Sequence, residues 1–171
     1  MSAKDGHMQL MSLDWSQLWI MGYVAFAMLM GALMGLEREL AGKPAGLRTH
    51  MLVTGATTLF VVLGNMLVQR FEADLGEQVI RSDPMRLISA VITGVSFLGA
   101  GTIIRHGPKQ PVEGLTTAAS MLFATAVGVT VALSQLLLAL GMTFLVLVIL
   151  RALAPLERWL NQCSLSAHRD E

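Results

Sequence analysis

The segment Val91–Ala119 reads VITGVSFLGAGTIIRHGPKQPVEGLTTAA and places a short basic loop between two apolar stretches rich in glycine and threonine. No charged residue occurs from Leu87 to Ile104, and none follows Glu113 until Arg151. The second uncharged run, Leu115 to Leu150, would form one helix about 54 Å long, well beyond a hydrocarbon core of about 30 Å. The sequence therefore predicts membrane spans, and the second run must fold back on itself.

The composition of the whole chain supports the same class. Hydrophobic residues make up 54% of the 171 and charged residues 14%, with a mean hydropathy of +0.61, whereas soluble domains carry about 25% charged residues. A net charge of zero offers no field for holding nucleic acid. The single cysteine, Cys163, excludes an intrachain disulfide, and the four histidines lack metal-ligand spacing. We therefore expect an integral membrane protein without zinc, a redox centre or another cofactor.

The fold class predicted is an all-α, polytopic transmembrane helix bundle that forms a single domain over residues 1–171, without a soluble C-terminal domain. Trp15 and Trp19 suit an interfacial aromatic belt before the first span. That span is longer than the apolar core of a signal peptide, about 7 to 15 residues, so we interpret it as a retained helix. About five spans are expected, at 18–36, 51–68, 87–104, 115–133 and 136–154, with the last two divided near Ser134 and Gln135.

The basic residues are distributed unequally between the two sides of such a bundle. With the N-terminus outside, the inner side receives eight Lys and Arg residues and the outer side four. The positive-inside rule therefore favours an N-out, C-in orientation. The residues assigned to the inner side are Arg38, Lys43, Arg48, Arg105, Lys109, Arg151, Arg158 and Arg169, and those on the outer side are Lys4, Arg70, Arg81 and Arg86.

Small residues recur at helical spacing, and in lipid such residues let helices approach closely. The pattern predicts that the third and fourth spans form the packed centre and that Gly94→Leu disrupts packing. Intramembrane threonines either satisfy backbone carbonyls, which we favour, or line a polar pathway. The small-residue pairs are Gly31 with Gly35, Ala90 with Gly94, Ser96 with Ala100, and Ser120, Ala124 and Gly128 in series; the threonines are Thr93, Thr102, Thr116, Thr117 and Thr125.

The first span ends in GLERELAGKPAGLRTH, residues 35–50, which puts Glu37 and Glu39 where a helix dipole prefers cations. We expect one of these carboxylates to pair with Arg48 across the turn, and Thr49 to cap the second helix. The alternative is that all these charges are solvated at the membrane surface. In the functional interpretation, the segment docks a partner or anionic lipid headgroups.

The loop before the third span offers a helix start and a weak metal-site candidate. Asp83 is a suitable N-cap for a helix beginning at Pro84. Glu72, Asp74 and Glu77 could attract Mg²⁺, but their spacing gives no ligand geometry and a solvated loop is the favoured alternative. No acid, base or histidine falls within residues 51–68, 87–104 or 115–150, which weakens an ion-transport hypothesis. No nucleophile, base and orienter form a recognisable arrangement, so an enzyme is not expected.

Several motifs together resemble the MgtC/SapB family of bacterial inner-membrane proteins. They lie in the expected order over roughly residues 30–131, although Ser96 stands where many relatives have glycine. The motifs are GLEREL (35–40), KPAGLRTH (43–50), DPMR (83–86), TGVSFLGAGTII (93–104) and GLTTAAS (114–120). The candidate site residues that the resemblance transfers are Glu37, Arg38, Arg48, Asp83, Arg86, Gly94, Gly99, Gly101, Gly114 and Thr116, with their chemistry unassigned.

The resemblance implies a multi-pass inner-membrane protein linked to magnesium homeostasis, acid stress and, in some pathogens, survival inside host cells. It implies a regulator of, or partner to, other membrane proteins such as the F-type ATP synthase and cation transporters, with a homo-oligomer left open. The alternative is a transporter of Mg²⁺ or another cation along threonine hydroxyls and backbone carbonyls. A purely structural membrane protein is the third class. The virulence-associated members continue into a soluble C-terminal domain, which this sequence is not expected to contain.

Overall fold

The computed structural model describes residues 15–75, 84–103 and 112–167, and these contain five helices and no strand. The all-helical bundle expected from the hydropathy is therefore confirmed. The helices are α2 (Trp15–Leu40), α3 (Leu47–Leu75), α4 (Pro84–Gly101), α5 (Leu115–Ala132) and α6 (Leu136–Ala167).

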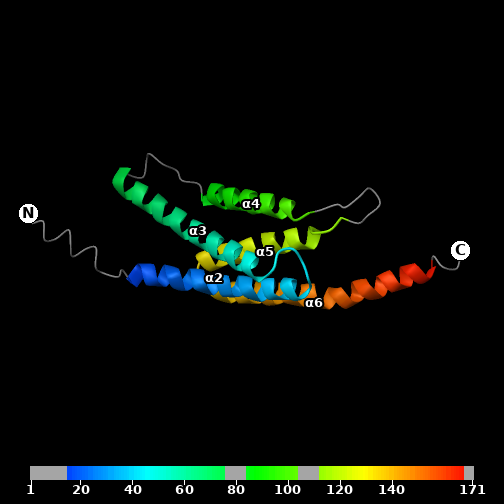
Figure 1. The fold of residues 1–171 in the computed structure, drawn as a ribbon. Helices are drawn as coiled ribbons and strands as arrows, with labels where there is room; N and C mark the ends of the chain where they lie inside the picture. Colours follow the sequence, from blue (N-terminus) through cyan, green and yellow to red (C-terminus); the bar gives the residue numbers. More distant parts are fainter. Residues whose placement is uncertain (1–14, 76–83, 104–111, 168–171) are drawn as a thin grey trace, which may run out of the picture.

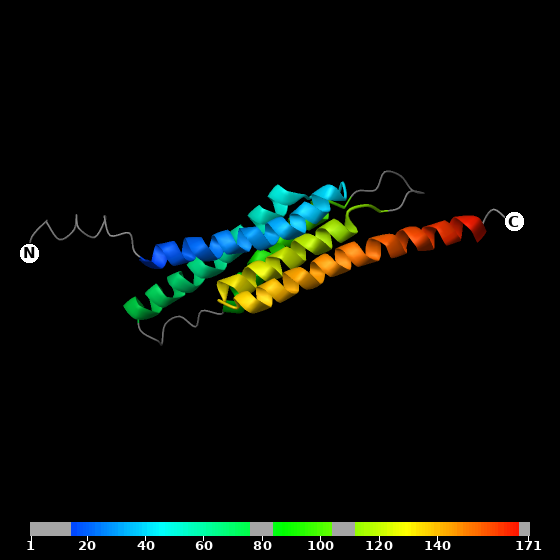
Figure 2. The ribbon, with the colours of Figure 1, turned by 90° about the horizontal axis from the view of Figure 1, so that it is seen from below.

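Successive helices run in alternating directions along one bundle axis (Figures 1 and 2). Helices α3 and α5 lie between α4 on one face and α2 with α6 on the other, and α4 contacts neither α2 nor α6 (Figure 1). Helix α2 begins at the end of the bundle opposite to the one where α6 ends. This arrangement is what an odd number of membrane crossings requires, and the N-out, C-in orientation stays a prediction.

Within the described residues, three helical segments are long and apolar enough to cross a membrane: Trp15–Leu40, Leu47–Arg70 and Leu115–Ala132. Two shorter apolar stretches, Met85–Gly101 and Leu136–Ala152, accompany them. At 1.5 Å per residue, the 17 residues of such a stretch lie at the lower limit of about 17 to 25 for a spanning helix. The chain is a membrane protein, and its five-span topology remains a prediction.

Two helix ends are fixed by the same backbone motif. Ser134 adopts a left-handed conformation (φ 61°), and the N–H groups of Ser134 and Gln135 donate to the Val131 and Thr130 carbonyls at 2.9 and 3.1 Å. These are the paired bonds of a Schellman cap, which satisfies carbonyls that a helix end leaves free. Gly42 (φ 67°) ends α2 in the same way. The predicted break of the long apolar run near Ser134 is thereby confirmed.

The packed centre is formed by α2, α3 and α5. A Cβ atom at Gly31 would lie 2.5 Å from the His50 carbonyl oxygen, and one at Gly35 would lie 2.7 Å from the Gly46 oxygen, so the α2 and α3 backbones nearly touch. On the other side of α3, a Cβ at Gly128 of α5 would lie 2.7 Å from the Thr54 oxygen. Only glycine permits these approaches, as the small-residue pattern of the first and fourth spans predicts.

The expectation that the third span belongs to this centre is wrong. Helix α4 lies at the periphery, and its small residues Ala90, Gly94, Ser96 and Ala100 are exposed. A Cβ at Gly94 would meet no atom within 4 Å, so the structure does not support disruption of packing by Gly94→Leu. Helix α4 is held by Leu87 against Gly64 of α3, by Gly99 against Ala118 of α5, and between them by Val95, which belongs to the buried hydrophobic core.

Candidate functional site

A buried histidine joins two helices near the turn between α2 and α3. His50 is 0% exposed, its Nδ1 lies 3.0 Å from the Gly46 carbonyl oxygen, and its Nε2 lies 3.0 Å from Ser120 Oγ of α5. Ser120 Oγ also lies 2.8 Å from the Thr117 carbonyl oxygen. The imidazole therefore links the first turn of α3 to the first turns of α5 through side-chain hydrogen bonds.

These contacts constrain the hydrogens of the imidazole. The Gly46 carbonyl can only accept, so Nδ1 carries a hydrogen. In the neutral ring Nε2 then accepts the Ser120 hydroxyl hydrogen; in the charged ring Nε2 donates, and that hydroxyl turns to the Thr117 carbonyl. Rotation of one hydroxyl thus satisfies the ring in either charge state.

An ion pair lies beside this histidine at the end of α2. The Arg38 Nε donates to Glu37 Oε2 at 2.7 Å, and the two side chains are only 5% and 14% exposed. Both charges are close enough to act on His50 electrostatically. Arg38 Nη1 is buried without a hydrogen-bond partner among the described residues. We call Glu37, Arg38, His50 and Ser120 the polar centre.

Glu39 takes a different role from the one expected for it. Its Oε2 accepts a hydrogen bond from the Leu47 N–H at 2.8 Å and so caps the N-terminus of α3, where a negative charge is favourable. The pairing of Glu37 or Glu39 with Arg48 is wrong, because Glu37 pairs with Arg38 and Arg48 is exposed. Thr49 is not the cap, because α3 already begins at Leu47.

The remaining candidate residues are not brought together. Helix α4 begins at Pro84 as predicted, Asp83 lies outside the described residues, and Arg86 is exposed. Gly114 (φ 90°) precedes α5 in contact with the Thr102 carbonyl, which requires glycine. Gly99 packs on Ala118, whereas Gly101 and Thr116 are exposed. Glu72 and Asp74, expected in a loop, lie in the last turns of α3, where their side chains are not described, and Glu77 lies outside the described residues.

The threonine hydroxyls of the bundle are largely used by the backbone. Thr93, Thr102 and Thr125 donate to the Ser89, Gly99 and Met121 carbonyls, so the favoured interpretation is confirmed for these three. Thr117 Oγ1 differs, being buried without a partner in the described part of the chain. Deeper in the centre, Thr58 donates toward the Thr54 carbonyl and the Gly128 carbonyl of α5, at 3.1 and 2.8 Å.

His50 and Ser120 were missed by the sequence reasoning. The charge pattern predicts a second span that starts at Met51 and so places His50 in the loop, and the small-residue pattern assigns Ser120 only to packing. The available signal was KPAGLRTH itself: Gly46 and His50 are four residues apart, so a helix starting at Leu47 aligns the ring with the Gly46 carbonyl.

A double-mutant cycle on His50→Leu and Ser120→Ala tests the link between α3 and α5. We expect a coupling free energy of about 0.6 kcal/mol, the average for hydrogen bonds between helices in membranes, and at most about 1.7 kcal/mol. The free energy of unfolding would be measured by SDS titration in mixed micelles. Additive effects of the two substitutions would show that the contact contributes nothing to stability.

Helix α4 presents a second feature on its outward side. Ser89, Thr93, Ser96 and Ala100 recur at spacings of four, three and four, so they share one face, and all four are exposed. The Thr93 hydroxyl donates to the Ser89 carbonyl at 2.8 Å. Small and hydroxyl residues are typical of helix–helix contacts in membranes, yet no helix among the described residues covers this face. We call it the outward α4 face.

Comparison with known proteins identifies the family. The MgtC family model matches residues 24–159. The chain is 38% identical to the protein SrpB of Synechococcus elongatus over 144 residues, covering 80% of this chain and 76% of SrpB. It is 34% identical to the protein MgtC of Salmonella typhimurium over 145 residues, 85% of this chain and 57% of that protein.

A third relative, the putative magnesium transporter YhiD of Escherichia coli, is 38% identical over 97 residues, 57% of this chain and 43% of YhiD. The chain thus spans about half of the length of two of these three relatives. No solved structure matches it. Because the family model covers most of the residues, including the polar centre and the outward α4 face, the chain belongs to the MgtC family.

Proposed function

We propose that this protein is a non-enzymatic regulator or assembly partner of other proteins in the bacterial inner membrane, acting in magnesium homeostasis and stress adaptation. The observation that carries the proposal is the outward α4 face. A helix that bears exposed Ser89, Thr93, Ser96 and Ala100 along one face is suited to close approach by a helix of another membrane protein.

The interior of the bundle favours this role over ion transport. The hydroxyls of Thr54, Thr57 and Thr143 donate to carbonyls of their own helices, at 2.7 to 2.8 Å, so their hydrogens and the carbonyl oxygens that accept them already serve the packing of the bundle. No group of three or more His, Cys, Asp or Glu side chains that could hold a metal ion occurs in the described residues. Transport stays the second candidate because of the printed name of YhiD, a putative magnesium transporter.

Site-specific photocrosslinking tests the docking role. A photoreactive residue at position 96 should form adducts with a membrane protein in cells grown at low magnesium. One at position 137, where Leu137 is 84% exposed on α6, serves as the matched lipid-facing control and should form none. Adducts at both positions, or at neither, would contradict a specific docking face.

A flux measurement separates the two functions. We expect liposomes that contain only the purified chain to take up no Mg²⁺ above protein-free liposomes. Uptake that depends on this protein, and that is lost with substitutions in α3 or α5, would overturn the regulator proposal and support transport.

A further inference from the structure

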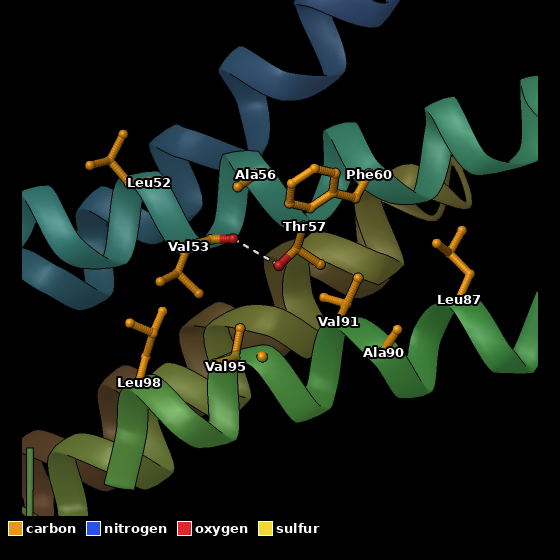
Figure 3. A pocket seen from close by; sticks show the side chains of 11 residues that line it. Leu52, Val53, Ala56, Thr57, Phe60, Leu87, Ala90, Val91, Val95 and Leu98 are labelled. Atoms are coloured by element: carbon orange, nitrogen blue, oxygen red, sulfur yellow. Dashed lines mark hydrogen bonds between the residues drawn. The ribbon is translucent and has the colours of Figure 1, made fainter. Parts of the chain in front are cut away.

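An apolar groove runs between α3 and α4, on the side of α4 opposite to the outward α4 face. Its volume is about 600 Å³. Among the described residues, Thr57 is the one polar side chain that lines it, and its hydroxyl donates to the Val53 carbonyl at 2.8 Å, so the lining offers no charge and no free donor to a polar ligand (Figure 3). Its walls include Leu52, Ala56 and Phe60 of α3 and Leu87, Gly94 and Leu98 of α4.

The groove exists because small residues face each other between the two ends of α4. Ala56, Ala90 and Gly94 leave the middle open, and a Cβ at Gly94 would meet nothing within 4 Å. Leu87 closes one end against Gly64. Atoms that line an unfilled gap lose their dispersion contacts. Because α3 is long and apolar enough to cross a membrane and α4 is an apolar helix beside it, we take lipid as the medium available to fill the groove.

The length of the groove matches that of a lipid acyl chain. Leu87 and Leu98 are eleven residues apart on α4, about 16 Å, which is close to half of a hydrocarbon core of about 30 Å. A lipid acyl chain of one leaflet has the matching length and is thin enough to enter.

Two arginines at one end of the groove favour a lipid with a negatively charged headgroup. Arg86 precedes the groove residue Leu87, and Arg70 lies near the end of α3 on the same side of the bundle. Both are exposed, and neither forms an ion pair with a side chain that the structure describes. A guanidinium binds phosphate oxygens through two parallel hydrogen bonds.

We propose that the α3–α4 groove is a binding site for an anionic phospholipid, with one acyl chain between Phe60 and Gly94 and the phosphate at Arg86. The lipid belongs to the leaflet in which α3 ends and α4 begins. It completes the contact between α4 and the bundle and so sets the position of the outward α4 face. The proposal does not depend on which protein docks there.

The test uses the full chain in vesicles of phosphatidylcholine with a trace of phosphatidylglycerol that carries a photoactivatable acyl chain. The probe should label residues 87–98 of α4 and 52–60 of α3. Gly94→Phe, which fills the groove, should lower this labelling at least fivefold. Gly141→Phe is the matched control, because Gly141 also has nothing within 4 Å of an added Cβ but lies on α6. Ala90→Phe fills the same groove from the preceding turn if Gly94→Phe fails to fold.

The headgroup is tested separately with phosphatidylcholine that carries the same photoactivatable chain. Arg86→Gln should lower phosphatidylglycerol labelling about fivefold, toward the phosphatidylcholine level, because one exposed cation is lost. Equal labelling by the two lipids, or labelling unchanged by either groove-filling variant, would overturn the proposal. Crosslinks between two copies of the chain at the groove would assign it to a protein contact and also overturn it.

Discussion

Replacing Gly31 by leucine is expected to separate α2 from α3 and to lower the free energy of unfolding by about 3 kcal/mol or more, the upper end of the range for overpacking. An added Cβ would lie 2.5 Å from both the His50 carbonyl oxygen and Thr54 Oγ1. The carbonyl belongs to the α3 backbone and cannot rotate away as a side chain does. The measurements are the free energy of unfolding in mixed micelles and the yield of monodisperse protein in mild detergent.

The matched control is Gly22→Leu in the same helix. An added Cβ at Gly22 meets nothing within 4 Å, and leucine favours helix over glycine by several tenths of a kcal/mol. We therefore expect this variant to be as stable as the parent or slightly more stable. If the two leucine variants behaved alike, the close approach of α2 and α3 would not be a stabilising contact.

The close approach of α2 to α3 at Gly31 and Gly35 could be predicted from the sequence. Two glycines one helical turn apart let another helix come close, and in lipid such close approach is what drives helices to associate. The same reasoning was wrong for Ala90 and Gly94. Hydrophobic patterning separates core from surface in water, but in a bilayer both surfaces of a helix are apolar, so the pattern does not identify the covered face. On α4 the small residues border a groove instead of a packed neighbour.

The polar centre could not be predicted for a different reason. The boundaries of the spans were drawn from charge alone, which placed Arg38 and His50 in aqueous loops. In the structure Glu39 caps α3 at Leu47, so the helix starts four residues before the expected boundary and carries His50 into the bundle. The Glu39 carboxylate caps a helix that begins eight residues later in the chain. The helix propensities of neighbouring residues do not predict such a contact, because it depends on how the chain folds back at the turn.

Replacing Arg38 by methionine is expected to lower the free energy of unfolding by about 3 kcal/mol, the lower end of the cost of breaking a buried ion pair from one side, because Glu37 is partly exposed. Glu37, 14% exposed, would keep its charge without the guanidinium that now lies 2.7 Å away. SDS titration in mixed micelles measures the loss. Arg48→Met, which removes an exposed cation near the same end of the bundle, should change stability little.

The double variant Glu37→Gln with Arg38→Met decides whether the loss comes from the uncompensated charge. A neutral amide next to methionine is far cheaper to bury than a carboxylate, so the double variant should recover much of the stability that Arg38→Met loses. The Nη1 atom without a partner strengthens this expectation, since removal of Arg38 also removes an unsatisfied donor. A double variant no more stable than Arg38→Met would mean that the arginine contributes through the packing of its buried side chain instead of through its charge.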